Sequence, residues 1–303
     1  MERALRYQYG GFGSRTVAPT DAPIPSFTGG PTWKSARTWQ RTVQEGTFVL
    51  SLIGQITGLV LALVALAPGT IPAALGTVLT LEIVAQGVEF AWYLGVGAMY
   101  ATVGFSFNVG SRYIDWVFTT PVMLVSIMIY ALYESEQCST AIEILNYGGG
   151  SRWVALVIMV VLDLLMLSIG LAYETKWDGP MNFWNFLTPV WTGNENRGLV
   201  WGFVPFLGIF ATYLPMSGGY KGGGVFSVAL TFVLWLLYGL VAVFTLTLGW
   251  GASDEEGRDQ LKNGAYNVLD VIAKNGVGIY ISATALSQNY TNTSACVNGT
   301  FVT

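Results

Sequence analysis

Residues 110–133 read GSRYIDWVFTTPVMLVSIMIYALY, a predominantly apolar stretch. Its length is close to the roughly 20 residues that a helix needs to cross a lipid bilayer. Two charged residues, Arg112 and Asp115, nevertheless stand near its beginning. A charge inside a bilayer is costly and is therefore a sign of function. This stretch predicts a membrane helix that carries part of a functional site.

Six further spans of similar length are apolar, at residues 46–68, 72–100, 152–174, 196–216, 224–249 and 263–285. Of the 303 residues, 52% are hydrophobic and only 11% are charged, whereas soluble domains carry about 25% charged residues. Spans and composition together predict an all-α membrane protein with a bundle of seven transmembrane helices. We expect a multi-pass protein of the plasma membrane or an internal membrane.

The same pattern predicts three regions along the chain. Residues 1–45 are rich in Gly, Pro, Thr and Arg and are expected to form an irregular N-terminal tail. Residues 46–285 form the helical domain, and residues 286–303 form a C-terminal tail. The segment 175–195 contains several aromatic residues, which suit a short helix or hairpin at the membrane–water interface.

Composition also excludes several classes of function. The chain contains no histidine and has a formal net charge of −4 without a basic run, so we expect no metal site and no nucleic-acid partner. No motif for hydride transfer, phosphoryl transfer or peptide hydrolysis is present. We therefore expect no enzymatic activity.

Seven charged residues stand out in the interior of the predicted spans, namely Glu82, Glu89, Arg112, Asp115, Asp163, Asp270 and Lys274. Asp270 and Lys274 are four positions apart and share a helix face. Arg112, Asp115 and Thr119 share a face of another helix. Two carboxylates, an arginine and a lysine are thus expected to converge between helices.

Two interpretations of this convergence are open. One is a buried ion-pair network that only fixes the packing of the helices. The other uses the amine of Lys274, which in its neutral form can react with an aldehyde to give a Schiff base. A protonated Schiff base is a cation and needs a carboxylate beside it, and Asp115 and Asp270 could supply that charge.

Three sequence motifs resemble those of the microbial (type 1) rhodopsins. Residues 112–121 read RYIDWVFTTP, which closely resembles the family signature R-Y-x-D-W-x-x-T-T-P. Residues 268–274 read VLDVIAK and resemble the L-D-x-x-A-K pattern around the lysine that binds retinal. Residues 234–238 read LWLLY and resemble the family's W-x-x-Y.

The resemblance implies that all-trans retinal is bound to Lys274 as a protonated Schiff base. By the same analogy, Asp115 is the primary counterion and proton acceptor, and Asp270 is the second counterion. Arg112 is the electrostatic partner toward the extracellular side. Thr119 is expected to form a hydrogen bond with Asp115.

The resemblance further implies a retinal pocket with walls on several helices. The residues expected in it are Trp116, Thr120, Met123, Trp201, Trp235 and Tyr238 along the polyene, Asp163, Met166 and Gly170 near the ring, and Tyr93 on the second span. Met123 occupies the position at which family members tune colour. An apolar residue there predicts green rather than blue absorption.

The chain departs from the usual pump pattern at the cytoplasmic proton donor. Pumps of the family usually have a carboxylate eleven residues after the acceptor, whereas this chain has Ser126, which gives an Asp115-Thr119-Ser126 motif. Glu82 on the second span is the expected replacement, with Ser126 as its hydrogen-bond partner. The alternative is that Glu82 extends to the membrane interface.

Three functions remain open at this point. The leading prediction is a light-driven outward proton pump, with the bilayer, protons and a second copy of the chain as partners. Glu89 follows Glu82 by seven residues on the same face, and paired glutamates could instead line the cation route of a light-gated ion channel. A slow-cycling sensory rhodopsin is the third possibility.

The orientation of the chain in the membrane is a separate question with two answers. The positive-inside rule places the basic N-terminal tail in the cytoplasm, whereas the resemblance places it outside.

Overall fold

The computed structural model describes residues 39–69, 71–103, 109–136, 140–147, 150–174, 197–216, 223–247, 255–287, 296–297 and 300–301. Most of the predicted N-terminal tail and the aromatic segment 175–195 lie outside the described residues.

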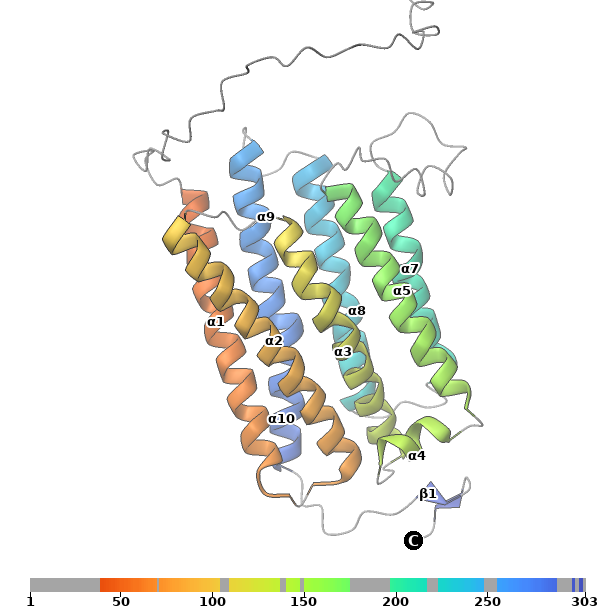
Figure 1. The fold of residues 1–303 in the computed structure, drawn as a ribbon. Helices are drawn as coiled ribbons and strands as arrows, with labels where there is room; N and C mark the ends of the chain where they lie inside the picture. Colours follow the sequence, from red (N-terminus) through yellow and green to blue (C-terminus); the bar gives the residue numbers. More distant parts are fainter. Residues whose placement is uncertain are drawn as a thin grey trace, which may run out of the picture. The chain divides into compact units, whose positions relative to one another are not determined.

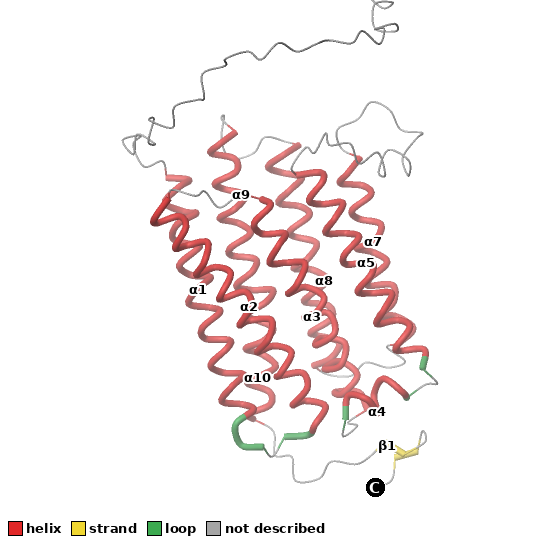
Figure 2. Tube along the Cα trace, in the orientation of Figure 1, coloured by secondary structure: helices red, strands yellow, loops and turns green. Residues whose placement is uncertain are grey.

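The described part of the chain is almost entirely helical (Figures 1 and 2). The helices are α1 (Trp39–Leu66), α2 (Ala73–Val103), α3 (Val109–Glu136), α4 (Ala141–Asn146), α5 (Ser151–Glu174), α7 (Arg197–Met216), α8 (Gly223–Ala242), α9 (Glu255–Asp270) and α10 (Val277–Ser287). Two π-helical segments, η1 (Val243–Thr247) and η2 (Val271–Gly276), continue α8 and join α9 to α10. Two short strands, β1 (Cys296–Val297) and β2 (Thr300–Phe301), pair antiparallel.

The long helices run alongside one another as a single bundle, and the short α4 lies across one end of it (Figure 1). Each helix packs against its neighbour in the order α1, α2, α3, α5, α7 and α8, and the rod made of α9, η2 and α10 closes the ring against α1. α3 additionally packs against α8 across the bundle. α3 therefore has neighbours on several sides and carries many of the buried side chains.

Five of these helices, α1, α2, α3, α5 and α8, are long and apolar enough to cross a membrane. The apolar part of α7, Trp201–Tyr213, is shorter. Large apolar side chains such as Ile53, Val154 and Val233 lie exposed on the outside of the bundle, which is expected where lipid is the solvent. The prediction of a multi-pass, all-α membrane bundle is confirmed.

The structure moves the starts of two predicted helices. α1 begins at Trp39 rather than at residue 46, so residues 39–45 are helical and do not belong to an irregular tail. The last rod begins at Glu255 rather than at residue 263. Both extensions are polar, and an apolar pattern marks only the part of a helix that contacts lipid. On α1, this polar extension contains Arg41 and Glu45, which form an ion pair at 2.9 Å.

The short helix α4 was not predicted. Thr140 caps its N-terminus by accepting a hydrogen bond from the main-chain N–H of Glu143, and the Glu143 side chain accepts one from the N–H of Thr140. This reciprocal arrangement is a capping box. Six residues are too few for a helical period to stand out in the sequence.

The close approach of α8 and α3 requires a glycine at position 224. A Cβ atom there would lie 2.7 Å from the carbonyl oxygen of Ala131 and 2.9 Å from its Cα. We therefore expect Gly224→Val to destabilise the protein by about 1–3 kcal/mol through overpacking, measured as a lower thermal unfolding temperature in detergent. Gly87→Val is the control, because nothing lies within 4 Å of a Cβ at Gly87; equal destabilisation by both variants would contradict this reason.

The η2 segment lies in the middle of the last rod and holds the residue on which the predicted site depends. Three consecutive side chains in it, Ala273, Lys274 and Asn275, are buried. In a regular α-helix, successive side chains point about 100° apart. Three consecutive buried side chains therefore need packing neighbours around a wide arc of the helix surface. π-helical segments are rare and are often found at functional sites.

Candidate functional site

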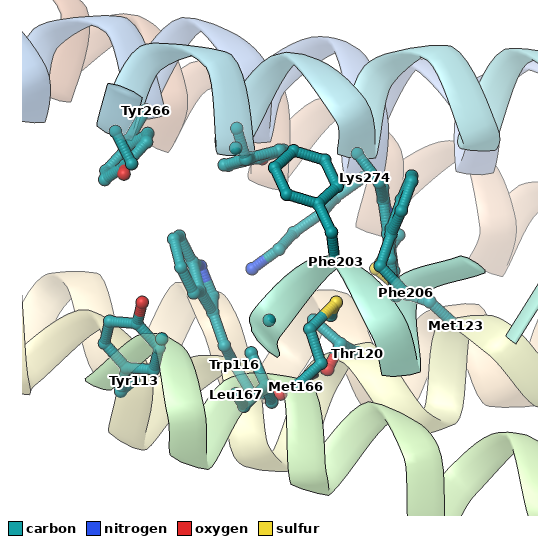
Figure 3. A pocket seen from close by; sticks show the side chains of 16 residues that line it. Tyr113, Trp116, Thr120, Met123, Met166, Leu167, Phe203, Phe206, Tyr266 and Lys274 are labelled. Carbon is teal, nitrogen blue, oxygen red and sulfur yellow. Dashed lines mark hydrogen bonds between the residues drawn. The ribbon is translucent and has the colours of Figure 1, made fainter. Parts of the chain in front are cut away.

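A cavity lies between α3, α5, α7, α8 and the last rod, and the amine of Lys274 extends into it (Figure 3). Its volume is about 140 Å³. Its walls are formed by Tyr113, Trp116, Thr120, Met123, Met166, Leu167, Gly170, Gly202, Phe203, Phe206, Trp235, Tyr238, Gly239, Ala242, Tyr266 and Lys274. The cavity is thus an apolar, largely aromatic chamber with one amine inside it.

The structure brings most of the predicted pocket residues to this cavity. Those that line it are Lys274, Trp116, Thr120, Met123, Met166, Gly170, Trp235 and Tyr238. They come from four separate parts of the chain, on α3, α5, α8 and η2. Asp163 and Tyr93 are buried but stand behind the wall, where each bonds to another site residue.

Trp201 requires a further correction, because it neither lines the cavity nor is buried. Its side chain is 43% exposed. From α7 the lining residues are Gly202, Phe203 and Phe206, and Figure 3 shows the two phenylalanine side chains among those drawn around the cavity. The prediction for Trp201 rested on a single residue match on α7. Successive residues of an α-helix point about 100° apart, and the neighbours of Trp201 face the cavity instead.

The amine of Lys274 lies among three carboxylates. Its Nζ atom donates a hydrogen bond to Asp115 Oδ2 at 2.9 Å and lies 3.4 Å from Glu89 Oε1 and 3.7 Å from Asp270 Oδ1. It also donates to the hydroxyl of Thr119 at 3.3 Å. All three carboxylates are at most 2% exposed. The predicted convergence of Lys274 with Asp115 and Asp270 is present, and Glu89 adds a third acid.

Thr119 bonds in a different way from the prediction. Its hydroxyl donates to the main-chain carbonyl of Asp115 at 3.1 Å, not to the carboxylate. Because the hydroxyl proton is used there, its oxygen is free to accept from Lys274. Thr119 therefore contacts the amine directly and fixes Asp115 only through the backbone.

Asp270 lies between Arg112 and Lys274 and contacts both of them. The guanidinium of Arg112 donates to Asp270 Oδ2 at 3.1 Å, and the hydroxyls of Tyr93 and Tyr238 donate to the two oxygens of the same carboxylate at 2.8 and 2.7 Å. Asp270 is thus bound by two tyrosines and an arginine. The bond from the charged guanidinium is of the charge-assisted kind, which is stronger than a bond between neutral groups.

Sequence analysis missed two asparagines that hold Arg112. The guanidinium donates to Asn263 Oδ1 at 3.1 Å, to the main-chain oxygen of Asn263 at 2.9 Å and to Asn267 Oδ1 at 2.5 Å. The spacing of Asn263, Asn267, Asp270 and Lys274 follows one helix face. That spacing was a signal in the sequence that could have identified both residues.

Asp163 and Thr120 form a second polar contact behind the cavity wall. The hydroxyl of Thr120 lies 2.8 Å from Asp163 Oδ2 and 2.8 Å from the main-chain oxygen of Trp116, and it donates its one proton to one of these two oxygens. Asp163 is completely buried. The contact ties α5 to α3 at the level of the cavity.

Glu82 and Ser126 meet on the side of Lys274 away from Arg112. The hydroxyl of Ser126 donates to Glu82 Oε1 at 2.5 Å. Glu82 is 2% exposed and Ser126 is completely buried, so Glu82 does not extend to the membrane interface. The pairing that the sequence suggested between α2 and α3 is therefore present.

Comparison with known proteins supports a single family. The family model described as bacteriorhodopsin-like protein matches residues 42–288. Among curated protein sequences, none matches the chain. Solved structures resemble it at low sequence identity, and such likeness shows the fold alone.

Three of these structures illustrate the likeness. Viral rhodopsin OLPVRII has a TM-score of 0.61 at 21% identity, covering 81% of this chain and 98% of its own. The rhodopsin of Exiguobacterium sibiricum has a TM-score of 0.59 at 17% identity, covering 81% and 96%. The blue light-absorbing proteorhodopsin from Med12 has a TM-score of 0.56 at 20% identity, covering 81% and 97%. With the family model matching most of its length, this chain belongs to the bacteriorhodopsin-like family.

Proposed function

We propose that this protein binds retinal at Lys274 and uses light to pump protons outward across the membrane. The observation that carries the proposal is the row of buried acids along the bundle. Asp115 contacts the amine of Lys274 at 2.9 Å, and Glu82 stands with Ser126 on the other side of it. A pump needs one acid that accepts a proton from the amine and another that returns one.

The cavity suits retinal in its chemistry. It contains one amine, which is the group that an aldehyde requires, and aromatic walls that suit a conjugated hydrocarbon chain. Gly170 belongs to this wall and lets Tyr113 pack closely, because a Cβ at Gly170 would lie 2.6 Å from the Tyr113 hydroxyl.

Retinal, when bound, supplies the absorption of light and a change of shape that alters the affinity of the Lys274 nitrogen for its proton. The chain's own residues direct where that proton goes. Asp115 receives it, because its Oδ2 is the closest carboxylate oxygen to Nζ. Asp270 accepts hydrogen bonds from Arg112 and from two tyrosines, which fix its carboxyl group beside the amine.

The balance of charges around Lys274 indicates that Glu89 is protonated and therefore neutral. Lys274 and Arg112 bring two positive charges to the site, whereas Asp115, Asp270 and Glu89 bring three acids. Negative charges held this close together repel one another, which favours the protonated form of one of the three carboxyl groups. Asp115 is nearest to the amine and Asp270 is bound to Arg112, so Glu89 is the acid that we assign as protonated in the dark.

We assign Glu82 as the donor that restores the proton to Lys274. With the N-terminus outside, as the family resemblance implies, transfer from the Glu82 side to the Asp115 side is outward. Glu82→Gln removes the donated proton while keeping the shape of the side chain. We expect it to slow reprotonation of the Lys274 nitrogen by on the order of 100-fold, the usual contribution of a positioned acid, measured by flash spectroscopy.

Two further measurements sharpen this test. Azide, a small diffusible proton donor, is expected to restore the rate in Glu82→Gln. Ser126→Ala removes one hydrogen bond worth about 1 kcal/mol and is expected to slow the step only about fivefold. If Glu82→Gln reprotonates at the normal rate, the proton comes directly from cytoplasmic water, and a slow pump or a sensor becomes the better assignment.

A light-gated ion channel is the second candidate, favoured by the acids of α2. Glu82 and Glu89 are both buried, and both face inward from one helix. Buried acids along one face could mark a path for cations. Photocurrent measured against voltage separates the two functions: a pump current keeps its sign over the range, whereas a channel current reverses at the equilibrium potential of the ion.

A further inference from the structure

The helices α7 and α8 form one side of the cavity, and they pack together less closely than the other neighbouring helices do. α7 packs along α5, whereas α7 and α8 make the least contact of the neighbouring long helices in the described bundle. Both helices nevertheless line the cavity, α7 with Gly202 and Phe203 and α8 with Gly239 and Ala242 among others. The seam between α7 and α8 is therefore the least tightly packed part of the cavity wall.

Aromatic rings fill one half of this seam, toward the end of α7 and the start of α8. Phe206 of α7 stacks on Phe232 of α8 with their ring centroids 5.4 Å apart. Phe210 of α7 meets Phe232 edge-on at 4.9 Å and Trp235 edge-on at 6.4 Å. Edge-on and stacked rings attract one another, so this half of the seam is closed.

Small residues take the place of these rings in the other half, toward the start of α7 and the end of α8. A Cβ at Gly239 on α8 would lie 3.0 Å from Phe203 Cζ, so the tip of the Phe203 ring reaches across to the main chain of α8. Beside it, a Cβ at Gly202 would meet Ile169 of α5 at 3.8 Å and, among the described residues, no atom of α8 within 4 Å. The Phe203 ring is thus the contact that spans the seam here.

The same half of the seam reaches the lipid-facing surface of the bundle. Gly202, Phe203 and Gly239 are each partly exposed. Phe206 and Trp235 are buried, although they line the same cavity. Contact with the cavity therefore does not by itself account for the exposure, which indicates that the seam opens toward the lipid.

Closer contacts hold the other walls of the cavity together. Between α5 and α7, a Cβ at Gly208 would lie 3.0 Å from Leu162 Cδ1. Between α8 and the last rod, Tyr238 donates a hydrogen bond to Asp270 at 2.7 Å, and α3 is tied to α5 through the hydroxyl of Thr120. Parting α3 from α5, or α8 from the last rod, would break buried polar contacts, which are costly to leave unmade.

We infer that the seam between α7 and α8 is the opening through which retinal reaches Lys274 from the lipid, and that the Phe203 ring closes it. The inference rests on the proposed function, in which Lys274 binds retinal. Retinal is largely hydrocarbon and therefore leaves water for lipid. Opening the seam requires the Phe203 ring to leave Gly239, which separates apolar atoms only. Such a local opening needs far less free energy than unfolding of the bundle.

Phe203→Ala tests the closing role, because it removes the ring that spans the seam. We expect retinal to enter about tenfold faster, since opening no longer separates an apolar ring from its packing surface. Entry is measured in vesicles on a Lys274→Ala background, where no bond can form, as the slow quenching by retinal of tryptophan fluorescence. Phe226→Ala is the matched control, because that phenylalanine of α8 is 52% exposed and does not line the cavity.

Gly202→Val tests the opening in the opposite direction. The Cβ of a residue at 202 has room beside Ile169, and the two methyl groups of valine would occupy the seam. We expect entry to be about tenfold slower, since the valine must leave its own apolar packing before the seam opens. In protein that keeps Lys274, the final visible band is expected to reach its full height. Gly87→Val is the control, because nothing lies within 4 Å of a Cβ there.

The outcomes separate this inference from the proposed function. If neither Phe203→Ala nor Gly202→Val changes the rate of entry, retinal takes another route and the opening is overturned. A reduced final band in Gly202→Val would show that position 202 belongs to the chamber alone, which also overturns its place in the opening. If the quenching rates change as expected but protein with Lys274 forms no visible band, the opening stands and the bond to Lys274 fails. Faster entry in Phe203→Ala and slower entry in Gly202→Val, with both controls unchanged, is the expected result.

Discussion

Lys274→Ala protein that is supplied with all-trans retinal should show no visible absorption band. The amine of Lys274 is the nucleophile that the proposed bond requires, and among the described residues it is the only lysine that lines the cavity. An alanine leaves the aromatic walls in place, so retinal could still enter but would remain a free aldehyde. Absorption spectroscopy of the purified protein, before and after hydroxylamine, measures the result.

Lys262→Ala is the matched control for this experiment. Lys262 is also buried, at 1% exposed, but it pairs with Asp259 at 3.3 Å on α9 and does not reach the cavity. It is expected to keep the visible band. A coloured Lys274→Ala protein that hydroxylamine bleaches would show that another amine binds retinal and would remove the basis of the proposed function.

Asp115→Asn should shift the absorption band to longer wavelength and stop transport. The negative charge of Asp115 stabilises the positive charge near the Lys274 nitrogen in the ground state more than in the excited state. Removing that negative charge therefore narrows the energy gap between the ground and excited states, and a narrower gap corresponds to absorption at longer wavelength. Because Asp115 is also the acceptor, its loss is expected to slow removal of the proton by about 100-fold or more. Absorption spectra and light-induced pH changes in vesicles measure the two effects.

Two comparisons test the reason for the shift. Acid titration of the unaltered protein protonates Asp115 and should shift the band in the same direction as Asp115→Asn. Glu89→Gln should leave the band nearly in place, because we assign Glu89 as already protonated. If neither Asp115→Asn nor acid moves the band, Asp270 or Glu89 is the counterion, and the assignment of Asp115 is wrong.

The sequence was most informative where charge and apolar surroundings conflict. Asp115, Asp270 and Lys274 stand out because a bilayer helix excludes charge, and their spacing identifies shared faces without any structure. The motifs around them, with the positions matched to those motifs, then predicted eight of the sixteen residues that line the cavity, including Trp235 and Tyr238. The fold followed from the same apolar spans, since each must cross the bilayer as a helix.

The remaining features depend on how the helices are rotated and how closely they approach. Trp201 and Phe203 are two residues apart, and only the rotation of α7 decides which of them faces the cavity. The approach of Gly224 on α8 to Ala131 on α3 also joins distant parts of the chain, and such approaches have no pattern along the sequence.

The η2 segment has a consequence for how the two ends of the last rod are coupled. A π-helical turn accommodates one more residue than an α-helical turn, so it fixes a rotational offset between α9 and α10. On the α9 side that offset keeps Asp270 beside Arg112, and on the α10 side it keeps Gly278 against Glu82. Tightening η2 by one residue would turn α10 by about 100° relative to α9. The register of this one turn therefore sets the rotation of α9 relative to α10, and insertions or deletions within it should be far less tolerated than substitutions.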